Sequence, residues 1–285
     1  MKILNIAGRL WMDDGQGFVD VAQASDGRFG SDPQAVFDLW PQFRAWARSS
    51  CPVGAATRPP GPLGSPVPRP GQMFAVGFNY ADHADELGDR SPARPVVFPK
   101  LPSCVSGPAD LVPLNGSQID WEVELVVVMG ARARNVAASD AWRHVAGLTV
   151  GQDISDRAEQ FEGDTPQYSL AKSLPGFGCL GPWMVTPDDV ANPDDLAITC
   201  SLNGETVQSS RTAKLIFGVG DLIEFISARV PLFPGDVIFT GTPSGVGLSR
   251  RPPRFLGPDD VLTGTIEGIG ELQTRFQAAP ERTPA

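Results

Sequence analysis

Three carboxylates precede the apolar part of residues 120–130, which read DWEVELVVVMG. If this segment is a strand, Asp120, Glu122 and Glu124 lie on one face, because side chains alternate along a strand. Neighbours on that face lie roughly 7 Å apart, and burying two like charges so close raises the pKa of one of them unless a positive group lies between them. The pattern therefore predicts either a solvated face or a cation site.

A candidate general base lies in residues 77–88, GFNYADHADELG. His83 and Glu86 are three residues apart, so a helical turn would place them on one face within hydrogen-bonding reach. A carboxylate that orients an imidazole makes a base that works near neutral pH. The same spacing is also common in surface contacts. The other histidine, His144, is expected to be structural.

Further polar side chains follow a predicted strand in residues 150–160, VGQDISDRAEQ, which contain Asp153, Arg157 and Gln160. The planar guanidinium group of Arg157 suits a substrate carboxylate. Lys172 lies in an apolar, glycine-rich context, SLAKSLPGFG. Taken singly, each of these residues is equally compatible with a solvated charge.

Two glycine-rich motifs resemble nucleotide-binding loops. GFGCLG at 176–181 matches GxGxxG, but prolines flank it where a dinucleotide fold needs a strand before and a helix after. GTPSGVG at 241–247 lacks the GK[ST] ending of a phosphate loop. We therefore expect no organic cofactor; the second motif is either a tight turn or a set of backbone amides placed against an anionic ligand.

Composition restricts the class of protein. The chain has 285 residues, enough for one large domain with or without a small appendage, and its net charge of −10 argues against nucleic-acid or anionic-membrane partners. No signal peptide and no membrane-spanning segment is recognisable, so we expect a cytoplasmic protein. The four cysteines form no CxxC pair, which argues against a zinc site or a disulfide framework; they are Cys51, Cys104, Cys179 and Cys200.

The chain divides into four parts. Residues 1–50 predict a small unit of strands and one helix interrupted at Pro41, in which apolar residues recur at helical spacing and the aromatic ones are expected in the core: Val36, Leu39, Trp40, Phe43 and Trp46. Residues 51–72, rich in proline and glycine, predict an extended linker. The main domain is expected at 73–276, and residues 277–285 are expected to be a flexible tail.

Short β-rich segments separated by turn signals dominate the main domain. Asn203-Gly204 predicts a two-residue hairpin turn. Helices are expected after Tyr80, around 137–144 and at 214–228. Because regular alternation of strands and helices is missing, we predict an α+β fold that is mainly β, with a mixed sheet.

The order of these segments resembles the fumarylacetoacetate hydrolase family. The resemblance covers residues 73–273 and rests on NYADHADE, DWEVELVVVMG, GLTVGQDISDR with a glutamine three residues on, AKS with GPWMVT, LNGETVQ, PGDVIFTGTPSGVG and EGIGEL. It implies a mixed β-sheet roll with a small N-terminal α/β unit, and a homodimer. It also implies Mg²⁺ or Mn²⁺ held by Glu122, Glu124 and Asp153, with Asp120 beside the ligands rather than among them.

The same resemblance implies roles for other residues. The catalytic dyad of the family, a general base and the carboxylate that orients it, matches His83 and Glu86, on a helix that can close over the site in relatives. Its substrate contacts match Arg157, Gln160, Lys172 and Thr242. This chain reads SDRAEQ where relatives commonly read SARDxQ, and KSLP where they read KSFD. Both differences put the identity of the substrate in doubt, but not metal binding.

The resemblance favours hydrolysis of a carbon–carbon bond in a 2,4-dioxo acid of the acylpyruvate or fumarylpyruvate type, as in aromatic catabolism. In that reaction His83 activates water, Lys172 stabilises an enolate, and Arg157 and Gln160 orient the small oxo-acid substrate. Alternatives are decarboxylation of a 3-oxo diacid such as oxaloacetate, and isomerisation or hydration of a related dienoate. A binding protein that uses the cation only for structure is the non-enzymatic alternative.

Overall fold

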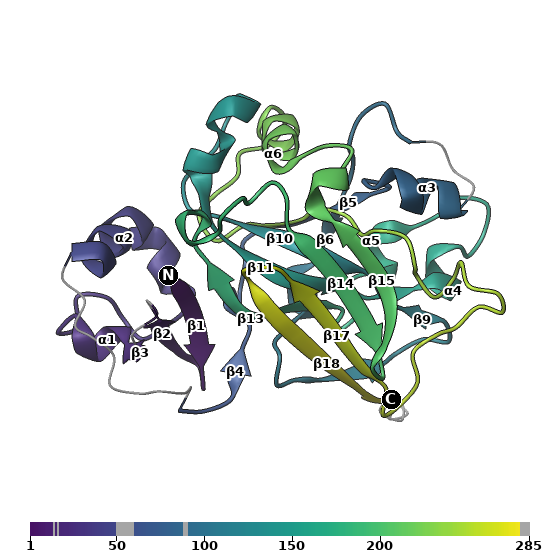
Figure 1. Ribbon diagram of the computed structural model, residues 1–285, viewed down its shortest axis with the longest axis horizontal. Coiled ribbons are helices and arrows are strands. Elements are labelled where there is room, and N and C mark those ends of the chain that lie inside the picture. The colour runs from purple at the N-terminus through teal and green to yellow at the C-terminus, as the bar shows by residue number, and fades with distance from the viewer. Residues whose placement is uncertain (14, 16, 50–59, 88–90, 280–285) are drawn as a thin grey trace, which may run out of the picture.

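Two β-sheets form the body of the protein and pack face to face (Figure 1). The structure, a computed structural model, describes residues 1–13, 15, 17–49, 60–87 and 91–279. The larger sheet has 11 strands and mixes parallel with antiparallel pairs. In spatial order they are β3 (Phe18–Asp20), β2 (Arg9–Asp13), β1 (Lys2–Ile6), β13 (Gly178–Val185), β11 (Val145–Asp153), β10 (Val123–Met129), β16 (Val237–Phe239), β5 (Met73–Gly77) and β6 (Val96–Lys100), with β4 (Leu63–Gly64) beside β1 and β7 (Val105–Ser106) beside β13.

The second sheet has five strands and covers the central strands of the first, in front of them in Figure 1. Its strands are, in order, β15 (Glu205–Arg211), β14 (Ala197–Leu202), β17 (Val261–Ile266), β18 (Gly270–Ala278) and β8 (Leu111–Leu114). Strand β14 alternates buried and half-buried residues, as expected where one face is packed and the other is wetter. A separate two-stranded ladder joins β9 (Ile119–Asp120) to β12 (Ser155–Asp156).

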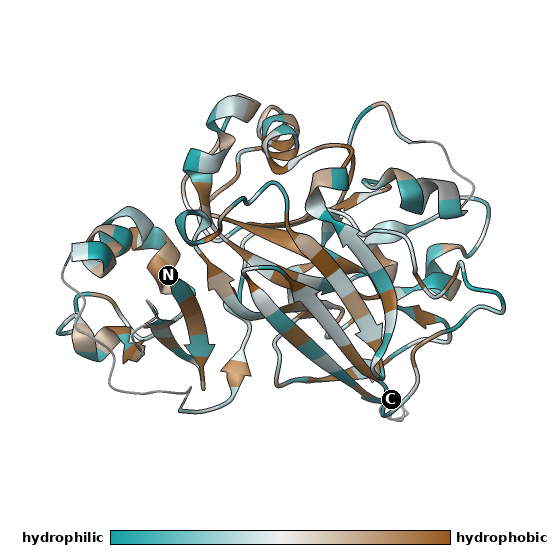
Figure 2. Ribbon diagram, viewed as in Figure 1, coloured by the Kyte–Doolittle hydropathy of each residue, from teal (hydrophilic) through white to brown (hydrophobic). Residues whose placement is uncertain are grey.

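Strands β10 and β11 are the centre of the core. Every residue of both strands is buried, and their apolar stretches stand out in Figure 2. Strands covered on both faces read as continuous apolar runs, which explains VELVVVM in β10. The second sheet approaches so closely that a Cβ atom on Gly264 of β17 would lie 2.9 Å from the side chain of Val123. This rigid centre fixes the polar residues at the strand ends.

Helices are short and lie around the sheets. The α-helices are α1 (Val21–Ala24), α2 (Trp40–Ser49), α3 (Ala81–Leu87), α4 (Arg157–Gln160), α5 (Tyr168–Ala171) and α6 (Val219–Ser227). The 3₁₀ helices are η1 (Ala35–Leu39), η2 (Pro102–Cys104), η3 (Ala138–His144), η4 (Pro187–Asp189) and η5 (Thr212–Lys214). The helix expected after Tyr80 is confirmed as α3. The segment at 137–144 is 3₁₀ rather than α, and α6 is shorter than the expected 214–228.

The N-terminal unit is joined to the body through its first strand. Strand β1 pairs with β2 on one side and with β13 on the other, so the large sheet continues into this unit. Its aromatic core is confirmed for Trp40, Phe43 and Trp46. Leu39, at the same helical spacing, is 42% exposed, and Phe37 is buried. The 3₁₀ turn η1 precedes α2 and shifts the register, with Pro41 in the first turn of α2 rather than at a break.

The connecting segments differ in part from the expectation. Within the predicted linker, β4 pairs with β1, whereas residues 51–59 lie outside the described part. Strand β18 extends to Ala278, two residues into the predicted tail, and pairs there with β8. The hairpin turn is confirmed, because Asn203 and Gly204 have φ angles of 52° and 85° between β14 and β15.

The fold is therefore α+β, mainly β, with a mixed sheet, as the sequence predicts. Three of the cysteines, Cys104, Cys179 and Cys200, are buried and free, and Cys51 lies outside the described residues. Across the described ranges, none of the helices has the length and apolar character needed to cross a membrane.

Candidate functional site

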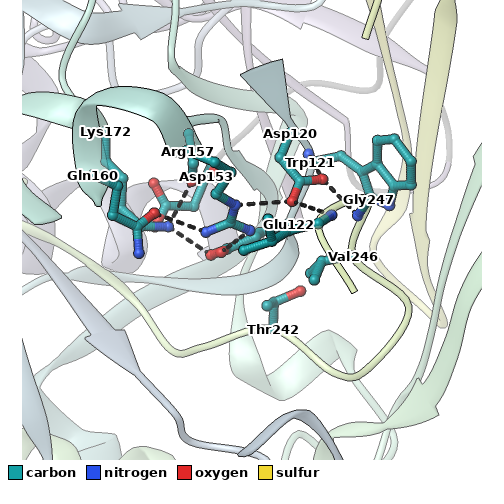
Figure 3. A network of polar contacts seen from close by, with 12 residues as sticks. Asp120, Trp121, Glu122, Asp153, Arg157, Gln160, Lys172, Thr242, Val246 and Gly247 are labelled. Carbon is teal, nitrogen blue, oxygen red and sulfur yellow. Dashed lines mark hydrogen bonds and ion pairs between the residues drawn. The ribbon is translucent and has the colours of Figure 1, made fainter. Parts of the chain in front are cut away.

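Three carboxylates meet where β10 begins and β11 ends. Glu122, Glu124 and Asp153 each offer an oxygen, and these atoms lie within 4.8 Å of one another. The antiparallel register causes this meeting, because Val123 is paired with Gln152 and the amide of Asp153 donates to the carbonyl of Glu122 at 2.9 Å. All three residues are buried. The face that carries Asp120, Glu122 and Glu124 is thus a buried charged site, not a solvated edge. Figure 3 shows Asp120 and Glu122 of this face.

Lys172 places a positive charge between two of these carboxylates. Its Nζ lies 2.8 Å from Glu122 Oε2 and 3.0 Å from Asp153 Oδ2, and it donates to Ser155 Oγ at 2.7 Å (Figure 3). The side chain is 3% exposed. Helix α5 ends at Ala171, so Lys172 is the residue that caps this short helix. The ammonium group offsets part of the charge that burial makes costly.

A second buried lysine, Lys100, was missed by the sequence reasoning. Its Nζ lies 2.6 Å from Asp153 Oδ1, and it also donates to the backbone carbonyls of Lys172 and Phe177. Lys100 ends strand β6 and is 1% exposed. The one signal in the sequence is a lysine that directly follows the apolar run PVVFP, and nothing there links it to a residue 53 positions away.

Arg157 ties the neighbouring acids together. Its Nε and Nη2 lie 2.8 Å from Asp120 Oδ2 and 2.7 Å from Glu122 Oε1. Its Nη1 donates to Gln160 Oε1 at 2.9 Å within helix α4. Asp120 also accepts from the amides of Gly247 and Leu248 at 2.6 and 3.0 Å. Asp120 therefore holds Arg157 beside the triad, and Asp120 itself is outside the group of three acids whose oxygens lie within 4.8 Å of one another.

The glycine-rich segment 241–248 supplies backbone amides to carboxylates of the protein itself. Gly241 donates to Glu124 Oε2 at 2.7 Å, and Gly245 donates to Glu86 Oε1 at 2.9 Å. Gly247 is required by close approach: a Cβ atom there would lie 1.9 Å from the carbonyl oxygen of Arg254. Thr242 donates to the carbonyl of Val123 at 2.9 Å and accepts from Gln208 Nε2 at 2.8 Å. This segment is thus a fixed wall of the site.

His83 and Glu86, the predicted general base and its carboxylate partner, both lie on α3. His83 Nδ1 lies 3.4 Å from Glu86 Oε2, and the imidazole stacks at 6.3 Å between centroids on Phe78. Glu86 is held in turn by the amide of Gly245 and by Ser249 Oγ at 2.5 Å. Burial works to raise the pKa of Glu86, but the hydrogen bonds from His83, Ser249 and Gly245 outweigh it and lower that pKa. Glu86 is therefore a carboxylate that can orient the imidazole.

A cavity of about 340 Å³ connects the two halves of the site. It is lined by six of the predicted residues, namely His83, Glu122, Arg157, Gln160, Lys172 and Thr242. The rest of its described lining is Val76, Gly77, Phe78, Phe98, Phe161, Pro166, Tyr168 and Leu248. Volume and lining fit a small organic substrate rather than a polymer.

The pKa values of the two glutamates move apart. Burial works to raise the pKa of Glu122, but Lys172 and Arg157 outweigh it and lower it to about 2. Burial, Asp153 and Glu122 raise the pKa of Glu124 well above its ordinary value. Lys100, Arg157 and Lys172 therefore do not fully neutralise the carboxylate triad. A divalent cation fits this donor set, because Mg²⁺ and Mn²⁺ prefer carboxylate oxygen ligands.

Comparisons with known proteins point to one family. The family model of the C-terminal domain of fumarylacetoacetate (FAA) hydrolase matches residues 72–277. Oxaloacetate tautomerase FAHD2A, mitochondrial, from Bos taurus is 45% identical over 210 residues, which are 73% of this chain and 67% of that one. Among solved structures, one from Mycobacterium smegmatis has a TM-score of 0.94 and 51% identity, and covers 98% of this chain and 100% of the other.

A further solved structure shows what a more distant relative binds. Maleylpyruvate hydrolase from Sphingobium sp. SYK-6, in complex with manganese (II) ion and pyruvate, is 25% identical with a TM-score of 0.76 over 98% of this chain and 100% of its own. The family model matches most of the chain, and the Bos taurus relative is 45% identical over 67% of its own length. The chain therefore belongs to the fumarylacetoacetate hydrolase family.

Proposed function

We propose that the protein is a divalent-metal-dependent enzyme that interconverts the keto and enol forms of a 2-oxo acid. The observation that supports this most is that His83 and Glu122 line one cavity, and that Glu122 belongs to a triad of carboxylates whose oxygens lie within 4.8 Å of one another. The relative named oxaloacetate tautomerase supports the same reaction type. Enolisation needs a base for the proton next to the carbonyl and positive charge at the oxygen, and both are available here.

Glu122, Glu124 and Asp153 would hold the metal, Mg²⁺ or Mn²⁺. When bound, it would supply a Lewis acid that polarises the 2-oxo group and stabilises the enolate charge. Asp120 keeps Arg157 beside Glu122, and Lys100 keeps Asp153 in place, so the triad is oriented by the chain itself. This arrangement agrees with the family expectation that the three acids are the ligands.

In the keto-to-enol direction, His83 would take the proton from the carbon next to the 2-oxo group and deliver it to the 2-oxo oxygen; in the reverse direction it would move the proton from that oxygen back to the carbon. Glu86 orients the ring through Nδ1, which leaves Nε2 for the substrate. The ammonium group of Lys172, between Glu122 and Asp153, adds positive charge where the enolate oxygen develops. Gln160 and Thr242 line the same cavity and would contact the substrate.

Hydrolysis of the carbon–carbon bond in a 2,4-dioxo acid is the second candidate. The His83–Glu86 pair favours it, because the same base can activate a water molecule for attack on the distal carbonyl. The hydrolase name of the manganese-bound relative supports it as well. Decarboxylation of oxaloacetate would proceed through the same enolate without an attacking water.

The test is to measure keto–enol conversion of oxaloacetate, its decarboxylation, and cleavage of acetylpyruvate, each with Mg²⁺ or Mn²⁺. We expect wild-type protein to accelerate tautomerisation and His83→Asn to lose at least about 100-fold. His144→Asn is the matched control, because His144 contacts the carbonyl of Arg132 and does not line the cavity. Release of acetate and pyruvate would favour the hydrolase. Metal-dependent stabilisation without turnover of these acids or of a 2-oxo acid with a larger substituent, such as phenylpyruvate, would favour the binding protein and contradict the proposal.

A further inference from the structure

Aromatic rings make up much of the apolar lining of the cavity. Phe98 stacks on Tyr168 with centroids 5.4 Å apart and an interplanar angle of 28°, and Phe78 meets Tyr168 edge-on at 6.5 Å. Phe161 and Leu248 line the same cavity, and Phe161 is 44% exposed. We call Phe78, Phe98, Phe161 and Tyr168 the aromatic wall. Half-exposed rings that line a cavity offer apolar area to a ligand.

The aromatic wall begins close to the reacting end. Lys172 Nζ lies 5.8 Å from the centroid of the Phe98 ring. His83 stacks on Phe78, so the base is also in contact with the wall. A substrate whose 2-oxo acid end lies between the triad and His83 would therefore place the substituent on its third carbon against these rings.

The cations of the cavity are already bonded to the protein. Among the residues that the structure describes, Arg157 and Lys172 are the lysine and arginine side chains that line it. Arg157 bonds Asp120, Glu122 and Gln160, and Lys172 bonds Glu122, Asp153 and Ser155. Each nitrogen of Arg157 and the ammonium group of Lys172 thus already has an acceptor in the protein, and no other described lysine or arginine lines the cavity beside the aromatic wall. A second substrate carboxylate there would lack a charged partner from the described residues.

The net charge of the buried acids and cations also argues against a second substrate carboxylate. Asp120, Glu122, Glu124 and Asp153 face Lys100, Arg157 and Lys172, which leaves one negative charge in excess when all are ionised. A divalent ion would turn this excess into one positive charge. A single substrate carboxylate neutralises that charge, whereas a second one leaves an uncompensated negative charge beside aromatic rings.

We propose that the preferred substrate is a 2-oxo acid with one carboxylate and an aromatic or bulky apolar substituent at its far end, rather than a dicarboxylic acid. The inference rests on the proposed function for the position of the 2-oxo acid end, and on the aromatic wall for the far end. It separates this chain from the relative named oxaloacetate tautomerase, because oxaloacetate carries a second carboxylate at that end. Phe98 is the main residue that determines the specificity.

Two unreactive mimics test this directly. N-benzyloxamate and N-oxalylglycine share the chelating 2-oxo acid end and a methylene link, and differ by a phenyl ring against a carboxylate. With Mg²⁺ present, we expect N-benzyloxamate to bind with a Kd at least about tenfold lower in isothermal titration. Equal or tighter binding of N-oxalylglycine overturns the inference, as does failure of both mimics when oxalate binds. Failure of oxalate itself would instead overturn the metal site and with it the proposed function.

Variants assign the preference to the aromatic wall. Phe98→Ala should reduce the ratio of the two Kd values to within about threefold, and Phe98→Arg should favour N-oxalylglycine, because it adds a charged partner. Phe233→Ala is the matched control: Phe233 is 45% exposed and does not line the cavity. A ratio that Phe98→Ala and Phe98→Arg leave at the wild-type value contradicts the role of the wall. The ratio of kcat/KM for phenylpyruvate over oxaloacetate should change in parallel.

Discussion

At the scale of single residues, the site is a balance between buried acids and buried cations. Lys172 contacts Glu122 and Asp153, while Lys100 contacts Asp153 from the other side. Breaking such a pair by removing one partner is strongly destabilising, because the other charge stays buried. Removing either lysine should therefore lower the free energy of unfolding, and a bound metal should offset part of that loss.

Lys172→Met should reduce kcat for enolisation by about two to three orders of magnitude, because it removes positive charge beside the developing enolate. Without metal the variant should also be less stable, since Glu122 and Asp153 lose a partner. Added Mg²⁺ should restore most of that stability in thermal unfolding. The control is Lys214→Met, at an exposed lysine of η5. Full activity of Lys172→Met would contradict the role given to Lys172.

Glu124 makes the stability of the metal-free protein depend on pH. Burial, Asp153 and Glu122 raise its folded pKa above the unfolded value of about 4.3. The folded state then holds a proton that the unfolded state has lost, so this contribution is complete below the unfolded pKa and disappears as pH rises through the folded pKa. We expect Tm in a chelator to fall over that window, and Glu124→Gln to flatten the fall. The same dependence of Tm on pH in wild type and Glu124→Gln would contradict this role of Glu124.

At the scale of elements, helix α3 depends on the glycine-rich segment for its position. Glu86 accepts from Gly245 and Ser249 while it orients His83, so one carboxylate fixes both the helix and the base. Glu124 and Asp120 accept from Gly241 and Gly247 of the same segment. The glycine-rich segment therefore links His83 and Glu86 to the carboxylate triad.

Glu86→Ala should loosen α3 and misorient His83. We expect kcat to fall by about 10- to 100-fold and amide hydrogen exchange at 81–87 to speed up, because hydrogen bonds to a charged group are lost. Glu224→Ala, at an exposed position of α6, is the matched control. Unchanged exchange in α3 together with reduced activity would assign Glu86 to chemistry alone and contradict its role as an anchor.

At the scale of the whole molecule, the N-terminal unit and the body share one sheet. Strand β1 bonds β13, and Arg44 and Arg48 form exposed ion pairs with Asp188 in the body. Exposed ion pairs contribute little to stability, whereas the aromatic cluster of the unit packs Phe43 against Phe29, Trp40 and Trp46. The proposed domain boundaries at 50 and 72, and the homodimer, stay predictions.

Phe43→Ala should destabilise the protein by about 3–5 kcal/mol, because it leaves a cavity in a closely packed cluster. Asp188→Asn should cost less than about 1 kcal/mol. In calorimetry, the unit and the body should unfold in one transition that Phe43→Ala shifts as a whole. Two separate transitions, of which this variant moves one, would show that the sheet does not couple them.

Local patterns determined much of the site in advance. Alternation in DWEVEL places three acids on one face, the spacing of His83 and Glu86 suits one helical turn, and Asn203-Gly204 sets a hairpin. These features depend on residues that are neighbours in the sequence, so their periodicity predicts their geometry. The order of such segments was also enough to indicate the family.

Only the tertiary structure decided which distant groups meet. Lys100 reaches Asp153, Arg157 is bonded to Asp120 and Glu122 in addition to Gln160, and Phe98 of β6 stacks on Tyr168 of α5. Leu39 reaches solvent because a 3₁₀ turn changes the register before α2. Sequence spacing carries no signal for contacts set by sheet order and packing, and these contacts determine the charge balance and the aromatic wall of the cavity.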